Sequence, residues 1–416
     1  MKKVLIFVFT PTYGGPHNQV NRLHKPLLNQ GYESVLCVHS DFDPAWHAHF
    51  RELGVEVLTF DFQRLRFNSF LKNNTRYVAS FGRDVRAIQL LIETVRPDVV
   101  QVCGLLNIQA VLAAKRAGVS VVWQLLSTFS PPPLRFVYGQ LVSRWARAVM
   151  STGTLVAQKH YLSGSVLNRL FPFYPPVETS RFTSTTDKKR DARQFLGLPD
   201  NALVIGTVGN RNRQKSHDQW VRIARQVLAC TDQDVYFVVV GAVTTSYQAT
   251  YQTQVQGFVT ENGLSDRIRF FESTIPVDTI LSGFDVFFLS SMAEGVPTVL
   301  LEAMSVGMPV VSTDVGAIPE IIQNNKNGFL YRFGQNDRAA AHLLRLIEDA
   351  PLRRQMARTN AQDARDKFDT AICATVHKQA YDFACLPHPS PSPKTGEGLN
   401  HPASETNLRQ YSPPLF

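Results

Sequence analysis

The sequence lacks the features of several common protein classes. Only five cysteines occur among 416 residues, with no Cys-x-x-Cys pair and no spacing typical of a metal site. We therefore expect buried free thiols in a reducing compartment. No apolar run approaches the ~18 residues of a membrane-spanning helix, so any membrane contact is expected to be peripheral. The short run at residues 4–9 has no signal-peptide cleavage site after it, which predicts a first buried strand. We expect a cytoplasmic protein, with any lipid contact at the inner face of the membrane.

Two common phosphate-binding motifs are also absent. No Gly-x-Gly-x-x-Gly fingerprint occurs, which argues against a dinucleotide-dependent dehydrogenase. Lys215-Ser216 is not part of a P-loop, because glutamine stands at position 214 where that motif needs glycine. A net charge of +9 nevertheless favours anionic partners, among them nucleotide phosphates, anionic lipids and nucleic acid.

Short apolar runs alternate with longer amphipathic stretches, which predicts an α/β protein with parallel sheets covered by helices on both faces. In the first part the expected strands are residues 4–9, 35–38, 55–58, 99–103, 119–123 and 148–151, and the expected helices are residues 17–30, 73–95, 108–117 and 134–147. The alternation stops at residues 171–191, which we interpret as an interdomain linker. It restarts with strands expected at residues 203–208, 235–240, 268–271, 286–289 and 309–312. The sequence thus predicts one architecture used twice, with ligands bound at the loops that follow the strands.

The most informative segment joins a strand to a helix at residues 290–304. Glu294 and Gly295 lie in the loop, and the helix is expected to begin near Pro297, where a missing N–H is harmless. Glu302 follows about a turn and a half later. A helix N-terminus attracts anions and carboxylates accept hydrogen bonds from hydroxyls, so a nucleotide sugar fits this segment. The simpler alternative is that Glu294 caps the helix and Glu302 lies on a solvated face.

A basic loop and a glycine pair add to this pattern. Arg211, Arg213 and Lys215 lie between an expected strand and a helix, where they either neutralise a diphosphate or form a solvated surface. Gly14 and Gly15 follow the first strand, and they either let the backbone approach a ligand or form an ordinary turn.

These motifs resemble those of a large family of retaining glycosyltransferases of the two-domain GT-B type, glycosyltransferase family 4 or glycosyl transferases group 1. The hallmark of that family is a pair of glutamates separated by seven residues, which is the spacing of Glu294 and Glu302. The resemblance covers most of residues 1–385 and includes residues 316–320, Gly14-Gly15, residues 176–178, Arg181-Phe182 and Lys215.

The resemblance implies a role for each site residue. Glu302 would hold the ribose hydroxyls of the donor, and Glu294 would be the catalytic carboxylate beside the donor sugar. The donor site would also include Gly14, Gly15, Lys215 and the backbone around Gly295, Val296, Pro297 and Thr298. Relatives commonly have an arginine five residues before the lysine. That position is Asn210 here, so Arg211, or else Arg213, is expected to take its place.

The resemblance also implies an architecture and a reaction. Two Rossmann-like domains would face each other across a cleft, with the acceptor domain at residues 1–176 and the donor domain at residues 177–367. A helix at residues 368–385 would cross back to the first domain, and the proline- and serine-rich residues 386–416 are expected to form a disordered tail. The reaction would move a sugar from a nucleoside-diphosphate-sugar to a hydroxyl of a glycan or lipid-linked acceptor, with retention and without a metal or other cofactor.

Several alternatives stay open. A non-catalytic relative that binds sugar nucleotides or glycans is suggested by Asn210 and by the loop after residues 119–123, which has no histidine and in which Gln124 is expected to contact a sugar hydroxyl. The triplets Asp41-Phe42-Asp43 and Asp232-Gln233-Asp234 resemble metal ligands, although so short a pattern arises easily by chance. Residues 60–72 interleave aromatic rings and cations, which fits inward packing, a peripheral membrane contact or a base-stacking surface. We expect no nucleic-acid partner.

Overall fold

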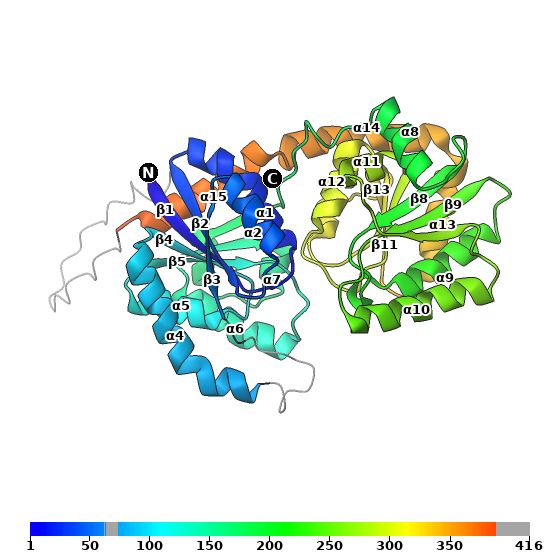
Figure 1. The fold of residues 1–416 in the computed structure, drawn as a ribbon. Helices are drawn as coiled ribbons and strands as arrows, with labels where there is room; N and C mark the ends of the chain where they lie inside the picture. Colours follow the sequence, from blue (N-terminus) through cyan, green and yellow to red (C-terminus); the bar gives the residue numbers. More distant parts are fainter. Residues whose placement is uncertain (62, 64–73, 388–416) are drawn as a thin grey trace.

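The computed structural model describes residues 1–61, 63 and 74–387 and has two α/β domains side by side (Figure 1). These residues form a seven-stranded sheet in the order β3-β2-β1-β4-β5-β6-β7 and a six-stranded sheet in the order β10-β9-β8-β11-β12-β13. Neighbouring strands pair in parallel, and helices cover both faces of each sheet. The prediction of one α/β architecture used twice is therefore confirmed.

Nearly continuous apolar strands form the core of the N-terminal domain. Every residue of β4 and β6 is buried, as a strand covered on both faces requires. The strands are β1 (Lys2–Val8), β2 (Tyr32–His39), β3 (Glu56–Phe60), β4 (Val99–Cys103), β5 (Ser120–Leu125), β6 (Ala148–Thr152) and β7 (Leu170–Phe173). The helices are α1 (Gly15–Asn29), α2 (Pro44–Glu52), α4 (Thr75–Val95), α5 (Ile108–Arg116), α6 (Pro132–Trp145) and α7 (Thr154–Gln158), followed by the 3-10 turn η1 (Gly164–Arg169).

The C-terminal domain repeats this pattern around a second core, in which Trp220 is fully buried and donates a hydrogen bond to the Phe288 carbonyl over 3.1 Å. Its strands are β8 (Leu203–Val208), β9 (Val235–Val240), β10 (Ile268–Phe271), β11 (Val286–Leu289), β12 (Val310–Thr313) and β13 (Gly328–Tyr331). Its helices are α8 (Thr186–Phe195), α9 (His217–Leu228), α10 (Ser246–Glu261), α11 (Val277–Ser282), α12 (Thr298–Val306), α13 (Asn336–Glu348) and α14 (Ala350–Lys367), with a 3-10 turn η2 (Arg213–Lys215). The last helix is α15 (Thr370–Cys385).

Both sheets change their direction of growth at the centre. The chain builds β1 to β3 outward on one side and then returns to place β4 beside β1, and in the second sheet it does the same with β8 and β11. The loops that follow such central strands diverge, which leaves a crevice at their carboxyl ends. A binding site is therefore expected in the loops after β1 and β4 and after β8 and β11.

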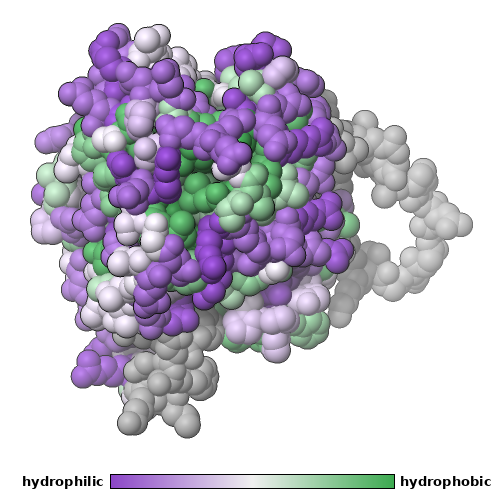
Figure 2. All heavy atoms as spheres, turned by 90° about the vertical axis from the view of Figure 1, so that its right-hand side faces the viewer, coloured by the Kyte–Doolittle hydropathy of each residue, from purple (hydrophilic) through white to green (hydrophobic). Residues whose placement is uncertain are grey.

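The face of the C-terminal domain that points away from the N-terminal domain has apolar atoms in a hollow surrounded by hydrophilic side chains (Figure 2). A cavity of about 320 Å³ lies at the amino ends of β11 and β12, where Phe284, Met308 and Pro309 line it together with Lys189 and Arg354. Because it lies at the amino ends of the strands, this cavity is separate from the expected site.

The interpretation of residues 171–191 as a linker is too broad at both ends. β7 pairs in parallel with β6, with Pro172 opposite Ser151 at the edge of the sheet. Proline is tolerated there because an edge strand has one row of N–H groups without a partner strand. α8 also begins inside this segment, where Thr185 caps it by accepting a hydrogen bond from the Lys188 N–H. The chain passes between the domains in the shorter stretch from β7 to α8.

Other expectations have mixed outcomes. β13 was not expected, because the strand has only four residues and polar sequence lies on both sides of it. All five cysteines are free, but Cys230 is exposed and Cys385 only half-buried. Most of residues 60–72, and residues 388–416 of the expected tail, lie outside the described residues. In the ranges that are described, no helix is both long enough and apolar enough to cross a bilayer.

α15 returns to the N-terminal domain and packs against α1 and β5 to β7 (Figure 1). At the crossing, the Val177 N–H donates to the Phe368 carbonyl over 2.8 Å and the Thr370 N–H donates to the Val177 carbonyl over 3.1 Å. Two segments far apart in the sequence therefore run together between the domains.

A buried hydrogen-bond network fixes α15 to this domain. His377 donates from Nδ1 to the Cys373 carbonyl over 2.7 Å, so its Nε2 is free to accept from the amide groups of Gln19 on α1 at 3.0 Å and Gln124 on β5 at 3.3 Å. Burial lowers the pKa of His377 to about 4, which keeps the ring neutral. Gln124 lies inside β5 and is fully buried, so the expectation that it contacts a sugar hydroxyl is wrong.

The loop after β11 lies directly against the loop after β5. The Thr128 N–H and hydroxyl both donate to the Glu294 carbonyl, over 3.4 and 3.3 Å. A Cβ at Gly295 would lie 2.0 Å from the Leu126 carbonyl oxygen and 2.5 Å from Thr152 Oγ1. Only glycine permits this approach of the two domains.

A carboxylate makes a second contact between the domains. Glu320 accepts hydrogen bonds from the N–H groups of Thr154, at 3.0 Å, and of Leu155 at the start of α7. It also accepts from the Tyr174 hydroxyl at 3.1 Å. A side chain of the C-terminal domain thus satisfies helix N–H groups of the N-terminal domain.

Acidification should destabilise the protein between about pH 6.5 and 4. The pKa of His377 falls from near 6.5 to about 4 on folding, so in this window the unfolded chain binds a proton that the folded protein does not. Melting temperatures should therefore decrease as the pH is lowered through this range. H377Q should show a shallower dependence, whereas H49Q, at a half-buried histidine outside the network, should follow the parent. A parent melting temperature that stays constant across the window would contradict the prediction.

Adding one methyl group at Gly295 should disturb the domain contact. The added Cβ meets a backbone carbonyl that cannot rotate away, so we expect G295A to lose about 1–3 kcal/mol of stability. The expected readout is a melting temperature several degrees below the parent and a larger radius of gyration in small-angle scattering. The matched control is G257A in α10, where a new Cβ has no contact closer than 4.0 Å. A G295A variant that matches the parent in both measurements would show that the two loops do not stay in contact.

Candidate functional site

The site lies where the loops after β8 and β11 meet at the carboxyl edge of the second sheet. Lys215 follows β8 in the turn η2, and Glu294 follows β11. The Lys215 ammonium donates to Glu294 Oε1 over 2.8 Å. Both side chains are largely shielded from water, so this ion pair is stronger than an exposed one. The structure therefore brings together two residues predicted from separate motifs.

Local hydrogen bonds hold Lys215 in this position. The Asn212 side chain accepts from the Lys215 N–H over 3.1 Å and begins the turn η2. Ser290, the first residue after β11, donates from its hydroxyl to the carbonyls of Lys215 and Ser216, over 3.0 and 2.9 Å. The basic loop and the loop carrying Glu294 are thus connected at their bases, which limits how far the ammonium and the carboxylate can separate.

Glu302 lies on α12 and faces a cation from the other domain. Arg22 of α1 donates to the Glu302 carboxylate and, over 2.8 Å, to the Pro176 carbonyl in the segment between the domains. Its Nε lies 3.7 Å from Glu178 Oε1. Burial raises the pKa of the Glu302 carboxyl, and the Arg22 charge opposes this rise. The alternative that Glu302 lies on a solvated face is therefore wrong.

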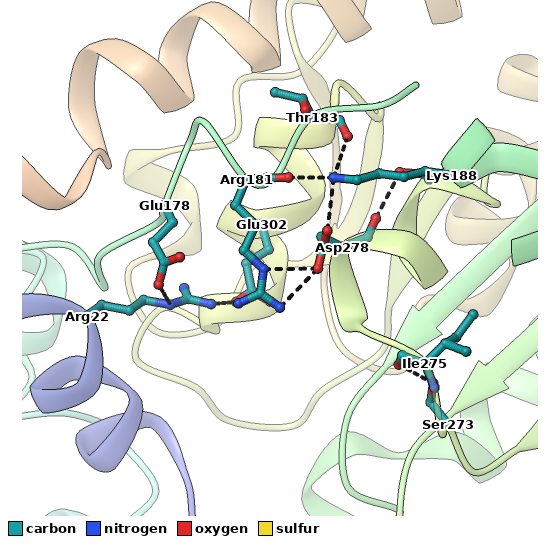
Figure 3. A network of polar contacts seen from close by, with 10 residues as sticks. Arg22, Glu178, Arg181, Thr183, Lys188, Ser273, Ile275, Asp278 and Glu302 are labelled. Carbon is teal, nitrogen blue, oxygen red and sulfur yellow. Dashed lines mark hydrogen bonds and ion pairs between the residues drawn. The ribbon is translucent and has the colours of Figure 1, made fainter. Parts of the chain in front are cut away.

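A second group of charges extends this network (Figure 3). Arg181 lies 3.1 Å from Asp278 at the start of α11, and Lys188 of α8 lies 2.9 Å from the same carboxylate. Burial would raise the pKa of Asp278, but Lys188 and Arg181 hold it below its usual value. The Arg181 charge also acts on Glu302. The segment between the domains, α8, α11 and α12 thus share one electrostatic environment.

The helix N-termini around the site lack side-chain caps. α1 begins after Gly14 and α12 begins after Pro297, and in neither case does the cap residue's side chain accept a hydrogen bond from the helix. A Cβ at Gly15 would meet nothing within 4 Å, so packing within the protein does not require glycine there. Open space beside free N–H groups is what an anionic ligand needs. Val296 and Pro297 are buried and Thr298 is half-buried, so these residues offer mainly their backbone to such a ligand.

Arg211 has a different environment from the one expected. Its guanidinium donates to the Phe271 carbonyl at the end of β10 and lies over the Phe270 ring at 5.7 Å. Burial lowers its pKa. Arg213 is exposed and lies over Tyr251 at 5.5 Å. A phosphate contact from Arg211 stays a prediction, and it requires this guanidinium to leave the Phe271 carbonyl.

The histidines near the site are buried and uncharged. His17 on α1 stacks on Phe42 with ring centroids 4.5 Å apart, and burial lowers its pKa to about 4. His217 follows Lys215 closely, and burial together with the Lys215 and Arg211 charges lowers its pKa to about 3. Both rings are neutral at pH 7, so neither carries a positive charge towards an anionic ligand.

The Asp-x-Asp triplets do not form a cluster of ligands. Asp43 caps α2 by accepting from the Ala45 N–H, and Asp234 pairs with Arg267. Within residues 1–61, 63 and 74–387, no group of three or more His, Cys, Asp or Glu side chains is arranged to hold a metal ion.

Sequence reasoning missed Arg22 and Asp278. Neither belongs to a recognisable local motif, because each acts through a partner far away in the chain: Arg22 is 280 residues from Glu302, and Asp278 is 97 from Arg181. A local signal exists only for Arg181, which lies in the linker motif.

Comparison with known proteins connects this geometry to a family. Residues 188–363 match the family model of glycosyl transferases group 1, a range that includes Lys215, Glu294 and Glu302. The chain is 30% identical over 196 residues to the N-acetyl-alpha-D-glucosaminyl L-malate synthase of Bacillus anthracis, which covers 46% of this chain and 49% of that protein. It is 27% identical over 283 residues to the D-inositol 3-phosphate glycosyltransferase of Corynebacterium urealyticum, which covers 67% and 65%. The alignments thus span less than two thirds of these relatives' length.

Solved structures share the complete two-domain fold. HepE of Anabaena, crystallised with UDP, superposes with a TM-score of 0.72 at 19% identity over 92% of this chain and 99% of its own. A glycosyltransferase of Rickettsia africae superposes with a TM-score of 0.74 at 14% identity over 92% and 98%. The chain has the GT-B fold, and its residues 188–363 match the glycosyl transferases group 1 family model.

Proposed function

We propose that this protein transfers a sugar from a nucleoside-diphosphate-sugar to a hydroxyl of a glycan or lipid-linked acceptor, with retention of the anomeric configuration. The observation that carries the proposal is the pairing of Lys215 with Glu294, beside a buried Glu302, at the switch point of the second sheet. A cation and two carboxylates in such a crevice suit the phosphates and hydroxyls of a nucleotide sugar.

The donor side of the proposal assigns one chemical task to each group. The Lys215 ammonium has three donors, so it can bind a diphosphate oxygen while still bonded to Glu294. Glu302 accepts from the ribose hydroxyls, and the Arg22 charge opposes the rise in the Glu302 pKa that burial causes. The free N–H groups at the start of α12 add positive potential where negative charge develops on the leaving diphosphate.

Retention does not require a protein base. On one face of the sugar, the departing phosphate oxygen can accept the proton of the attacking hydroxyl, and the protein then has to stabilise the charge of the leaving group. His17 is neutral and enclosed, which agrees with a mechanism that needs no protein base. Contact between the loops after β5 and β11 would keep water from the donor while the acceptor is bound.

Relatives support the choice of donor and acceptor. HepE has been crystallised with UDP-glucose. The UDP-Gal:alpha-D-GlcNAc-diphosphoundecaprenol alpha-1,3-galactosyltransferase of Escherichia coli is 27% identical over 177 residues, covering 42% of this chain and 44% of that enzyme. We extend these properties to this chain as a nucleotide-sugar donor and a lipid-linked or glycan acceptor, used by a cytoplasmic protein at the inner face of the membrane.

Removal of either donor contact should abolish turnover and leave the fold intact. K215A and E302A are each expected to lose at least ~100-fold in the rate of nucleoside diphosphate release with acceptor, since charged contacts of this kind contribute several kcal/mol. The matched controls are K326A and E348A, at exposed positions of the same domain. Turnover within a few-fold of the parent would remove that residue from the site. A parent that binds donors but transfers nothing across a broad panel would favour the non-catalytic alternative.

Transfer should continue in the presence of EDTA. Lys215 and the helix N-termini supply the positive charge that the diphosphate needs. Initial rates in buffer, in EDTA, and in EDTA followed by excess Mg²⁺ or Mn²⁺ test this directly. A loss of rate that either metal restores would contradict the prediction and would favour Asp41 and Asp43 as metal ligands.

A further inference from the structure

A long stretch of the N-terminal domain carries no negative side chain. Between Asp98 and Glu178 the sequence has no aspartate or glutamate. The same stretch has seven cations: Lys115, Arg116, Arg135, Arg144, Arg147, Lys159 and Arg169. It forms β4 to β7 and α5 to α7, so these cations belong to consecutive elements of one domain.

Helix α6 in this half presents apolar side chains to solvent. Its inward face is formed by Gly139, Val142 and Ser143, at the spacing of one helical stripe. The outward face carries Phe136 and Val137, whose exposed fractions are 54% and 53%. The outward face of a helix in a globular protein is normally polar, so an apolar one indicates a contact surface.

A neighbouring turn extends this apolar face. A Cβ at Gly139 would lie only 1.8 Å from the His160 carbonyl oxygen, so α6 and the turn are in close contact. Arg135 donates to the Lys159 carbonyl over 2.9 Å and Gln140 donates to the Tyr161 carbonyl over 2.8 Å. These bonds position Tyr161 so that its ring meets Phe136 edge to face at 6.0 Å.

Tyr161 itself is held in an unusual conformation. Its φ of +53° lies in the left-handed region that a bulky side chain rarely adopts, and its side chain is nevertheless exposed. Such backbone strain persists only where the surroundings fix it. The aromatic pair on this face is therefore a rigid feature of the domain.

Two further exposed apolar side chains lie on segments adjoining the two ends of α6. Phe129 is exposed and follows Thr128, the residue that bonds to the Glu294 carbonyl beside the site. Leu167 is exposed on η1, which Arg169 ties to the carboxyl end of α6 through the Ser143 and Ala146 carbonyls. We define the α6 surface as Phe129, Phe136, Val137, Tyr161 and Leu167.

We infer that the α6 surface docks on an anionic lipid bilayer, with its apolar side chains at headgroup depth and Arg135, Arg144 and Lys159 against lipid phosphates. Exposed aromatic and aliphatic side chains beside cations, with no acidic residue in the segment, match the chemistry of such an interface. A nucleic acid would use the cations but gains nothing from Val137 and Leu167, which cannot stack on bases.

The position of Phe129 connects this surface to the proposed activity. Phe129 of the apolar surface directly follows Thr128, which contacts the Glu294 loop. An acceptor whose lipid stays in the bilayer would therefore meet the protein next to the cleft. Docking itself does not depend on sugar transfer and is measured without donor or acceptor.

Cosedimentation of the full chain with vesicles tests the inference. The parent should pellet with phosphatidylglycerol vesicles and not with phosphatidylcholine vesicles, and added salt should weaken the binding. The combined variant F136S/V137S/Y161N should bind at least ~10-fold more weakly, because it removes most of the insertable area. Asparagine is chosen at position 161 because it tolerates a positive φ. R144E/K159E should show a comparable loss.

The matched control is Y247S/F333S, which removes two exposed apolar side chains from the C-terminal domain and should bind like the parent. Equal melting temperatures of the variants verify that the fold is kept. The inference is overturned if the triple variant pellets like the parent, or if the parent binds both kinds of vesicle equally or neither. Tighter binding to duplex nucleic acid than to phosphatidylglycerol, unchanged in the triple variant, would instead assign the cations to a nucleic-acid partner.

Discussion

The arrangement of the two domains depends on the close approach of the Gly295 backbone to the Leu126 carbonyl. Glu294 lies one residue away and uses its own carbonyl to accept from Thr128, so the same short loop carries both the domain contact and the proposed catalytic carboxylate. Any change in the relative position of the domains therefore also moves Glu294 relative to Lys215. A side chain at position 295 would push the two loops apart, and glycine is the residue that avoids this.

Much of the fold could be predicted from the sequence, because the patterns that indicate its strands are local ones. Buried parallel strands such as β4 need apolar residues at every position, which makes them visible without knowledge of their neighbours. β7 was missed because its proline suggests a linker until the edge of a sheet is known to lie beside it. Lys215 and Glu294 were each predicted from motifs as residues of the donor site, whereas their ion pair and the environment of Glu302 were not. That environment is made by Arg22, from the other domain, and a distant ion pair leaves no periodic signal in sequence.

Arg22 connects the proposed ribose contact to the segment between the domains. The same guanidinium bonds to Glu302 and to the Pro176 carbonyl, and it lies over the Phe182 ring at 5.1 Å. A buried carboxylate without such a partner would become protonated and would lose its value as an acceptor for two hydroxyls. A residue of the N-terminal domain thus opposes the protonation of a buried carboxylate in the C-terminal domain.

The return of α15 has a consequence for the order in which the molecule is made. Because α1, β5, β6 and β7 complete their packing only against α15, the second domain is in effect an insertion within the first. A ribosome synthesises β1 to β7 early, but the helix that covers them appears only after the entire second domain has been translated. The surface that will hold Tyr381 and Ala384 stays uncovered during that interval, so the first domain can complete its packing only after the second has been translated. The second domain needs no segment after α14 for its own core, so its packing does not have to wait for α15.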